Sequence, residues 1–187
     1  MNAAPEHVVG IGASAGGIEA LGELLSRFKH DATSFVVVTH LSPDARSFLA
    51  EILQRSTSMA VQRADKAVNL IPNYIYVSPP GVDLTIQGNV LAPVQQRSAR
   101  PRWSIDRFFA DLAYDRRAQA VGIVLSGSGR DGAAGLAAIR AGGGKTFCQT
   151  PESAQFEEMP RSAQASADFC LSPAELGDQL MRSLGIV

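Results

Sequence analysis

The feature that most constrains the fold is a set of short, uninterrupted apolar runs separated by longer segments with helical periodicity. The apolar runs lie at residues 8–11, 35–38, 120–125, 145–148 and 169–171. A strand with one face in water alternates apolar and polar residues, whereas a parallel strand covered on both faces is apolar throughout. These runs therefore predict parallel strands buried between two layers of helices.

The segments between the apolar runs carry the helical pattern. They lie at about residues 16–28, 45–56, 104–115, 132–141 and 173–184. A repeated succession of strand and helix implies right-handed crossovers and a parallel sheet. The expected fold class is therefore α/β, with a doubly wound, mostly parallel sheet and helices on both of its faces.

The middle of the chain departs from this alternation. Residues 74–77, 84–86 and 90–91 are rich in aromatic and β-branched side chains, and turn signals lie at residues 79–81 and 87–89. Short strands joined by turns of Gly, Pro and Asn favour antiparallel pairing. We expect an antiparallel hairpin here, inserted at the edge of the main sheet.

Size and composition limit the classes of protein to consider. With 187 residues, of which 45% are hydrophobic, the chain fits one domain with a proper core. Its net charge of -1 gives no overall field that would attract nucleic acid or an anionic membrane. No apolar run approaches the roughly 18 residues that span a bilayer, and the first residues lack a signal-peptide pattern. We expect a cytoplasmic protein that neither binds nucleic acid nor inserts into a membrane.

The two cysteines, Cys148 and Cys170, each lie inside a predicted strand. This placement favours small buried side chains in a reducing compartment over a disulfide bond. The sequence contains neither a paired Cys-x-x-Cys motif nor a cluster of histidines, so it offers no ligand set for a structural zinc ion.

Polar residues just after the predicted strands are the first candidates for chemistry, because open parallel sheets bind ligands at the carboxyl ends of their strands. Residues 12–16 read Gly-Ala-Ser-Ala-Gly. This is the G-x-S-x-G pattern in which a tight turn between strand and helix exposes a serine hydroxyl. Ser14 is the candidate nucleophile, and the amide of Ala15 would lie at a helix N-terminus, where it could stabilise an oxyanion.

A serine nucleophile needs a base that accepts its proton, and the chain contains three histidines. His7 precedes the first strand and His30 follows the first helix, so both are expected at the opposite edge of the sheet. His40 directly follows the second strand, at the same edge as Ser14. The order of the elements therefore selects His40 as the candidate base.

The carboxylate that would orient the base is expected after the strand at residues 120–125. The loop at residues 126–132 reads Ser-Gly-Ser-Gly-Arg-Asp-Gly, and its glycines allow sharp turns. Ser14, His40 and Asp131 are thus predicted to form a Ser-His-Asp triad. Each residue alone also has an ordinary explanation, since a serine or aspartate can cap a helix and a histidine can end a strand.

A nucleotide-binding turn is a rival interpretation of the same glycines. Residues 10–15 fit G-x-G-x-x-A, and residues 127–132 fit G-x-G-x-x-G. However, the strand that ends before His40 has no acidic residue at its tip to hold a ribose. Asp131 would place a negative charge in a turn meant for a pyrophosphate. A dinucleotide-binding domain is therefore the less favoured alternative.

Taken together, these loops resemble the catalytic domain of the chemotaxis protein-glutamate methylesterase family, the CheB type. The matching segments appear in the family's order and cover nearly the whole chain. They are residues 9–17, 38–43 with 46–47, 74–80, 125–133 and 159–161.

This resemblance implies a single doubly wound catalytic domain over residues 1–187. Such a domain hydrolyses γ-glutamyl methyl esters on the cytoplasmic helices of methyl-accepting chemoreceptors, releases methanol, and often also deamidates receptor glutamine. The family's serine, histidine and aspartate fall on the three residues of the predicted triad. Amides near Ala15 or Ser128 would hold the oxyanion, and Met159 and Arg161 are candidates for substrate contact. The resemblance implies no cofactor and no metal.

Three positions differ from the best-known members of that family. Ala15 stands where they carry threonine, and Ser128 where they often carry methionine. Both differences resemble methylesterase domains that are fused to a methyltransferase domain. Glu158 stands where a glycine is common, which places a carboxylate near the expected cleft.

The usual member of the family begins with a receiver domain and a linker, and we expect this chain to contain neither. A receiver or methyltransferase domain is therefore a candidate regulatory partner. A catalytically weak binding or scaffolding module with the same fold is the alternative function. The three intact triad residues argue against it, because a module freed from catalysis has no need of all three.

Overall fold

The computed structural model describes residues 4–29, 32–40, 48–95 and 103–186. A central sheet of seven strands runs through the molecule in the order β10-β9-β8-β1-β2-β5-β3, and its neighbouring strands are parallel. Its strands are β1 (His7–Ala13), β2 (Thr33–Thr39), β3 (Ala60–Arg63), β5 (Tyr74–Val77), β8 (Ala120–Val124), β9 (Lys145–Gln149) and β10 (Phe169–Leu171). The expected α/β fold with a mostly parallel sheet is confirmed.

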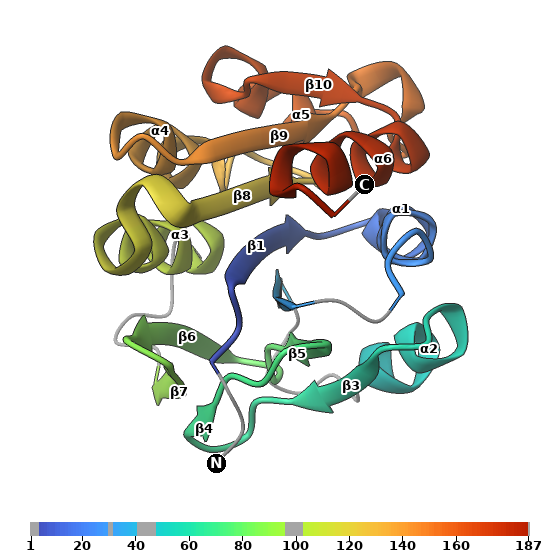
Figure 1. Cartoon of the computed structure of the whole chain (residues 1–187). Helices are drawn as coiled ribbons and strands as arrows, with labels where there is room; N and C mark the ends of the chain where they lie inside the picture. Colours follow the sequence, from blue (N-terminus) through green and yellow to red (C-terminus); the bar gives the residue numbers. More distant parts are fainter. Residues whose placement is uncertain (1–3, 30–31, 41–47, 96–102, 187) are drawn as a thin grey trace.

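Helices cover both faces of this sheet (Figure 1). One face carries α1 (Gly17–Leu25), α2 (Leu49–Ser56) and α6 (Pro173–Leu184), and the other carries α3 (Ser104–Arg116), α4 (Ala133–Ala141) and α5 (Glu158–Ala163). Alternate residues of one strand enter the two cores, so that Val8 packs on the α3 side and Val9 on the α1 side. Burial on both faces explains why the strands are apolar throughout.

The chain leaves the central strand β1 in two directions. From β1 it passes to β2 on one side, and it later returns to β8 on the other side before continuing to β9 and β10. The strand order therefore reverses beside β1, and open parallel sheets bind ligands at the carboxyl ends of the strands around such a reversal. The carboxyl ends of β1, β2 and β8 meet at this place.

The antiparallel hairpin is confirmed, but its place differs from the expectation. Its strands β6 (Val82–Gln87) and β7 (Val90–Gln95) join β4 (Val68–Asn69) in a separate sheet of order β4-β7-β6. Residues 74–77 instead form β5 and pair in parallel with β2 and β3. The buried side chains of the second sheet, Leu84, Ile86 and Leu91, pack into the core on the α3 side of the main sheet.

Glycines on β1 let α3 approach the sheet closely. A Cβ atom on Gly12 would lie 2.4 Å from Cγ2 of Ile105, and one on Gly10 would lie 3.0 Å from a ring carbon of Phe109. The start of α3 therefore reaches the carboxyl edge of the sheet. None of the helices among the described residues has the length and apolar character that a membrane-spanning segment requires.

A test of the packing concerns Gly135, where α4 crosses α3. A Cβ atom there would lie 2.5 Å from Cβ of Phe109 and 2.9 Å from Cα of Asp106, so backbone would have to move. We expect Gly135→Ala to lower the free energy of unfolding in urea by about 1–3 kcal/mol.

The matched control is Gly22→Ala in α1. The nearest atom to its new Cβ would be Oγ of Ser56 at 3.3 Å, a side chain that can rotate away. This variant should be neutral or up to about 1 kcal/mol more stable, because alanine favours a helix. Equal effects of the two substitutions would contradict the close packing of α3 on α4.

Candidate active site

The predicted triad residues lie at three neighbouring strand ends. The parallel register pairs Ala13 at the end of β1 with Thr39 at the end of β2, so Ser14 and His40 are the next residues on adjacent strands. Adjacent strands lie about 4.8 Å apart. On the other side, the amide of Ser14 donates to the carbonyl oxygen of Ser126 over 3.0 Å. The sheet itself therefore brings these loops together.

Ser14 packs directly against the loop after β8. A Cβ atom on Gly127 would lie 2.8 Å from Cβ of Ser14 and 2.2 Å from the sulfur of Met159. Only a glycine fits between these two side chains. The absence of a side chain at position 127 thus allows the loop after β8 to approach the candidate nucleophile closely.

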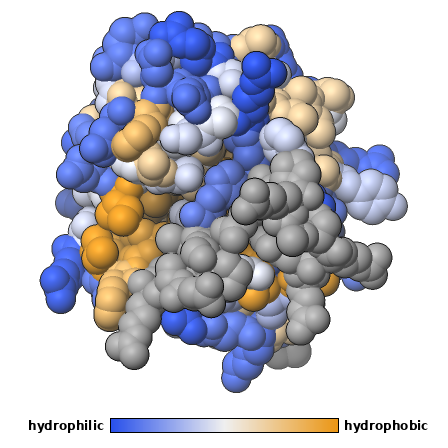
Figure 2. Space-filling model, turned by 180° about the vertical axis from the view of Figure 1, so that it is seen from behind, coloured by the Kyte–Doolittle hydropathy of each residue, from blue (hydrophilic) through white to orange (hydrophobic). Residues whose placement is uncertain are grey.

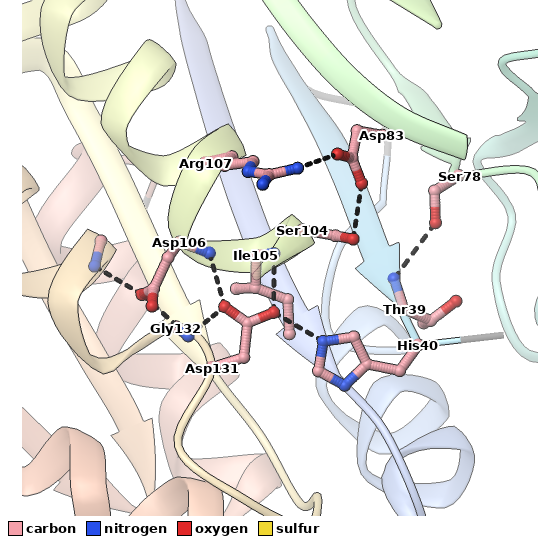
Figure 3. A network of polar contacts seen from close by, with 11 residues as sticks. Thr39, His40, Ser78, Asp83, Ser104, Ile105, Asp106, Arg107, Asp131 and Gly132 are labelled. Carbon is pink, nitrogen blue, oxygen red and sulfur yellow. Dashed lines mark hydrogen bonds and ion pairs between the residues drawn. The ribbon is translucent and has the colours of Figure 1, made fainter. Parts of the chain in front are cut away.

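The imidazole of His40 is held by the carboxylate of Asp131 (Figure 3). Nε2 of His40 lies 2.5 Å from Oδ2 of Asp131, and the two side chains are 17% and 3% exposed. Nδ1 is therefore the ring nitrogen that points away from the carboxylate. Within the described residues, no hydrogen bond joins the Ser14 hydroxyl to this ring. A catalytic hydrogen bond of this kind is often long without substrate and tightens in the complex.

The carboxylate of Asp131 also caps the N-terminus of α3. Its Oδ2 accepts a hydrogen bond from the amide of Ile105 over 2.9 Å, and its Oδ1 accepts one from the amide of Asp106 over 2.8 Å. Both amides belong to the first turn of α3, whose dipole stabilises a negative charge at that end. Asp131 thus caps a helix, as the ordinary explanation allowed, but it caps α3 and orients His40 at the same time.

Asp106, in the first turn of α3, in turn accepts hydrogen bonds from the segment that follows Asp131. Its Oδ1 accepts hydrogen bonds from the amides of Gly132 and Gly135, over 2.9 and 2.7 Å, at the start of α4. The start of α3 is therefore capped by Asp131, from the loop before α4, and the start of α4 by Asp106, from α3 (Figure 3). Burial, and the nearby negative charge of Asp131, raise the pKa of Asp106. Asp106 was not predicted from the sequence, because an acidic residue in a first helical turn is common.

The second sheet fixes the start of α3 from the opposite side. The buried carboxylate of Asp83, in β6, accepts the hydroxyl of Ser104 over 2.6 Å and Nη1 of Arg107 over 2.8 Å. The hydroxyl of Ser78 accepts the amide of Thr39 over 3.1 Å, just before His40. Sequence reasoning also missed Asp83 and Ser78, because nothing in the local pattern relates them to α3 or β2.

The backbone amides of Ala15, which follows Ser14, and of Ser128, which follows Gly127, have no protein acceptor among the described residues. Ala15 and Ser128 are both exposed, on the loops after β1 and β8. The neighbouring amide of Gly129 is occupied, since it donates to Oε2 of Glu158 over 2.6 Å. Glu158, which the sequence placed near the cleft, therefore ties down this loop.

The two residues expected to contact substrate differ in their surroundings. Met159 is fully buried under Gly127, so it supports the active-site loop from behind and does not face the cleft. Its side chain belongs to the core cluster on the α3 and α4 side of the sheet. Arg161 is exposed and pairs with Glu157 over 2.7 Å.

The described part of the chain contains no group of three or more His, Cys, Asp or Glu side chains arranged to hold a metal ion. The polar groups at the strand ends are instead a hydroxyl, an imidazole, a carboxylate and two open amides. This is a set suited to acyl transfer, in which a nucleophile, a base and oxyanion donors converge.

Comparisons with known proteins agree with this geometry. The family model described as CheB methylesterase matches residues 9–180. A protein-glutamate methylesterase/protein-glutamine glutaminase of Burkholderia lata is 32% identical over 186 residues, which cover 96% of this chain and 51% of that protein. One from Shewanella oneidensis is 33% identical over 188 residues, which cover 97% of this chain and 54% of that protein. The chain thus spans about half the length of these relatives.

A solved structure shows the same fold. The catalytic domain of the CheB methylesterase of Thermotoga maritima superposes with a TM-score of 0.83, covering 95% of this chain and 98% of that one. The sequence identity of the pair is 22%, so the likeness concerns the fold.

The raised pKa of Asp106 predicts how the hydrogen bonds between this residue and the start of α4 depend on pH. A carboxyl group whose pKa is raised in the folded protein stabilises the fold below its unfolded pKa, and this contribution is lost as pH rises through the folded pKa. Asn keeps an acceptor for the two amides and carries no charge. Asp106→Asn should therefore be more stable than the unmodified chain at pH 7, by less than about 1 kcal/mol for this half-buried group. The difference should vanish near pH 3.5.

Urea unfolding of both proteins across this pH range measures the effect. Asp106→Ala is the control, because it loses both hydrogen bonds to α4 and should cost about 1 kcal/mol at every pH. If the Asn and Ala variants were equally destabilised at pH 7, the charge of Asp106 would be a net benefit, contrary to this account.

Proposed function

Because the chain belongs to the CheB methylesterase family, we propose that it is a serine hydrolase that demethylates glutamate γ-methyl esters of a protein substrate. The observation that carries the proposal is the hydrogen bond between His40 and Asp131, beside Ser14, where the strand order reverses. We further propose that residues 1–187 act as one catalytic domain, in which Ser14 is the nucleophile, His40 the base and Asp131 its positioning residue.

The first half of the reaction follows from these positions. Oγ of Ser14 attacks the ester carbonyl carbon while Nδ1 of His40 accepts the hydroxyl proton. The carbonyl oxygen becomes an oxyanion, and the open amides of Ala15 and Ser128 donate to it. When the intermediate collapses, the bond to the methoxy oxygen breaks and His40 delivers its proton to that oxygen. Methanol leaves, and a glutamyl ester of Ser14 remains.

In the second half of the reaction, water takes the place of Ser14 as the nucleophile. His40 takes a proton from water, the resulting hydroxide attacks the acyl carbon, and the proton passes to Oγ of Ser14 as the ester bond breaks. The products are the free serine and a glutamic acid side chain, which releases its proton to solvent and becomes a carboxylate. A glutamine side chain presents the same acyl carbon with ammonia as the leaving group, so the same residues account for the glutaminase activity in the names of the relatives.

Asp131 acts by fixing the imidazole and by stabilising its protonated form. Because the contact is made to Nε2, the nitrogen that handles the proton is Nδ1. The two backbone amides of α3 that donate to the Asp131 carboxylate prevent this side chain from rotating. The imidazole of His40, which is bonded to the carboxylate, is therefore held in one orientation.

The proposed substrate is the methylated cytoplasmic region of a chemoreceptor, in keeping with the resemblance of the active-site loops to chemotaxis methylesterases. This places the action of the protein in the cytoplasm. Since the chain spans about half the length of its relatives, we propose that a receiver or methyltransferase domain regulates it. The overall charge of -1 supports neither nucleic acid nor a membrane as the partner.

The proposal predicts that Ser14→Ala abolishes methanol release from a methylated chemoreceptor fragment. We expect the rate to fall by at least about 1,000-fold, because no other group replaces the nucleophile. The melting temperature should change little, since the Ser14 hydroxyl makes no hydrogen bond within the described residues.

Ser26→Ala is the matched control, because this exposed serine lies at the far end of α1 and bonds only to the local backbone. It should keep full activity. Equal activity of Ser14→Ala and the unmodified chain would remove Ser14 from its role. If the unmodified chain released no alcohol from the receptor fragment or from a small activated ester, the hydrolase would be refuted in favour of a binding module.

A further inference from the structure

Two thiols outside the active site lie opposite each other on neighbouring strands. Cys148 of β9 pairs with Cys170 of β10 in the parallel register, and their sulfur atoms are 2.9 Å apart. Both are free cysteines. Registered residues on adjacent strands have Cα atoms about 4.8 Å apart, which lies inside the range of about 4.4–6.8 Å that disulfide bonds span. A disulfide would need only a small movement of the two strands.

The two cysteines differ in their access to solvent. Cys148 is fully buried beneath the helices, whereas Cys170 is partly exposed on β10, the outermost strand of the sheet. β10 has three residues, and an edge strand is held on one side only. A small oxidant can therefore reach Cys170 first, and the short edge strand can adjust as its sulfur is drawn towards Cys148.

One side-chain hydrogen-bond donor faces the sulfur of Cys170. Nε2 of Gln164 lies 3.7 Å from that sulfur and can donate to a thiolate, the reactive form of cysteine. Burial raises the pKa of the Cys148 thiol, so Cys148 remains a protonated partner within reach. An accessible thiol with a second thiol beside it is the arrangement of an attacking and a resolving cysteine.

We propose that Cys148 and Cys170 form a redox site that peroxide oxidises to a reversible intrachain disulfide. The Cys170 thiolate attacks one peroxide oxygen, the O–O bond breaks, hydroxide leaves, and a sulfenic acid forms. The sulfur of Cys148 then attacks the sulfur of Cys170, the S–O bond breaks, and the Cys148 proton leaves with the hydroxyl group as water. In total, two thiols and one hydrogen peroxide give one disulfide and two waters. A small dithiol reverses the change by thiol–disulfide exchange.

The site lies close to the active-site loops. Cys148 precedes Gln149, whose Oε1 accepts the amide of Ser126 over 2.9 Å, and Ser126 in turn binds the amide of Ser14. The sulfur of Cys170 also contacts the carbonyl oxygen of Gln149 over 3.5 Å. The disulfide would thus tie the edge strand to the segment that supports the loop after β8.

The test uses hydrogen peroxide on the folded 187-residue chain, followed by alkylation of free thiols and mass spectrometry. The expected product is a monomer that has lost two hydrogen atoms, with one peptide linking Cys148 to Cys170, and dithiothreitol should restore the original mass. Circular dichroism before oxidation establishes that the protein is folded. This readout requires no enzyme activity, so its outcome is independent of the proposed hydrolase.

Single substitutions identify the two roles. In Cys148→Ala the sulfenic acid of Cys170 has no resolving partner, so dimedone should label Cys170 at least ten-fold more than in the unmodified chain. In Cys170→Ala the buried Cys148 should stay reduced. Three results would overturn the proposal: over-oxidation of Cys170 with Cys148 still reduced, a disulfide between two chains, or two unreacted thiols at a peroxide concentration that labels Cys148→Ala.

Discussion

The structure of the proposed active site depends on one buried carboxylate, that of Asp131. A charge that is 3% exposed is costly unless it is paired, and here the amides of Ile105 and Asp106 and the ring of His40 satisfy it. The two amides come from a helix N-terminus and cannot turn away. The donors that make the buried charge tolerable therefore also determine where it points, and it points at His40.

That arrangement requires α3 to start at the carboxyl edge of the sheet, and several features far apart in the chain bring it there. Gly12 leaves room on β1 for Ile105, and Asp83 of the small second sheet holds the first residues of α3. Asp106 ties the same turn to the start of α4. The second sheet, which an α/β fold does not require, thus contributes to the position of Asp131.

These contacts mark the limit of what the sequence predicts. The strands were evident because burial on both faces leaves an uninterrupted apolar run, and the strand-end rule then placed Ser14, His40 and Asp131 at one edge. Asp83 and Asp106 left no such trace, since their partners lie more than 20 residues away and a local pattern carries no information about them. The turn residues predict the hairpin. Its place in a separate sheet depends on the packing of Leu84 in the core on the α3 side, which a local pattern does not reveal.

The groups at the site fall into two kinds, and the difference follows from what each must do. The cap of α1 is Gly16, with a φ of 70° and no side-chain hydrogen bond, so the Ser14 hydroxyl is not used to cap the helix. The proposed nucleophile and oxyanion donors must form new bonds during a reaction, and within the described residues the Ser14 hydroxyl and the open amides make no hydrogen bond. A positioning carboxylate must not move, and Asp131 is saturated with donors. Gly16 caps α1 without using the Ser14 hydroxyl, which stays free. The amides at the N-terminus of α3 hold the Asp131 carboxylate in place.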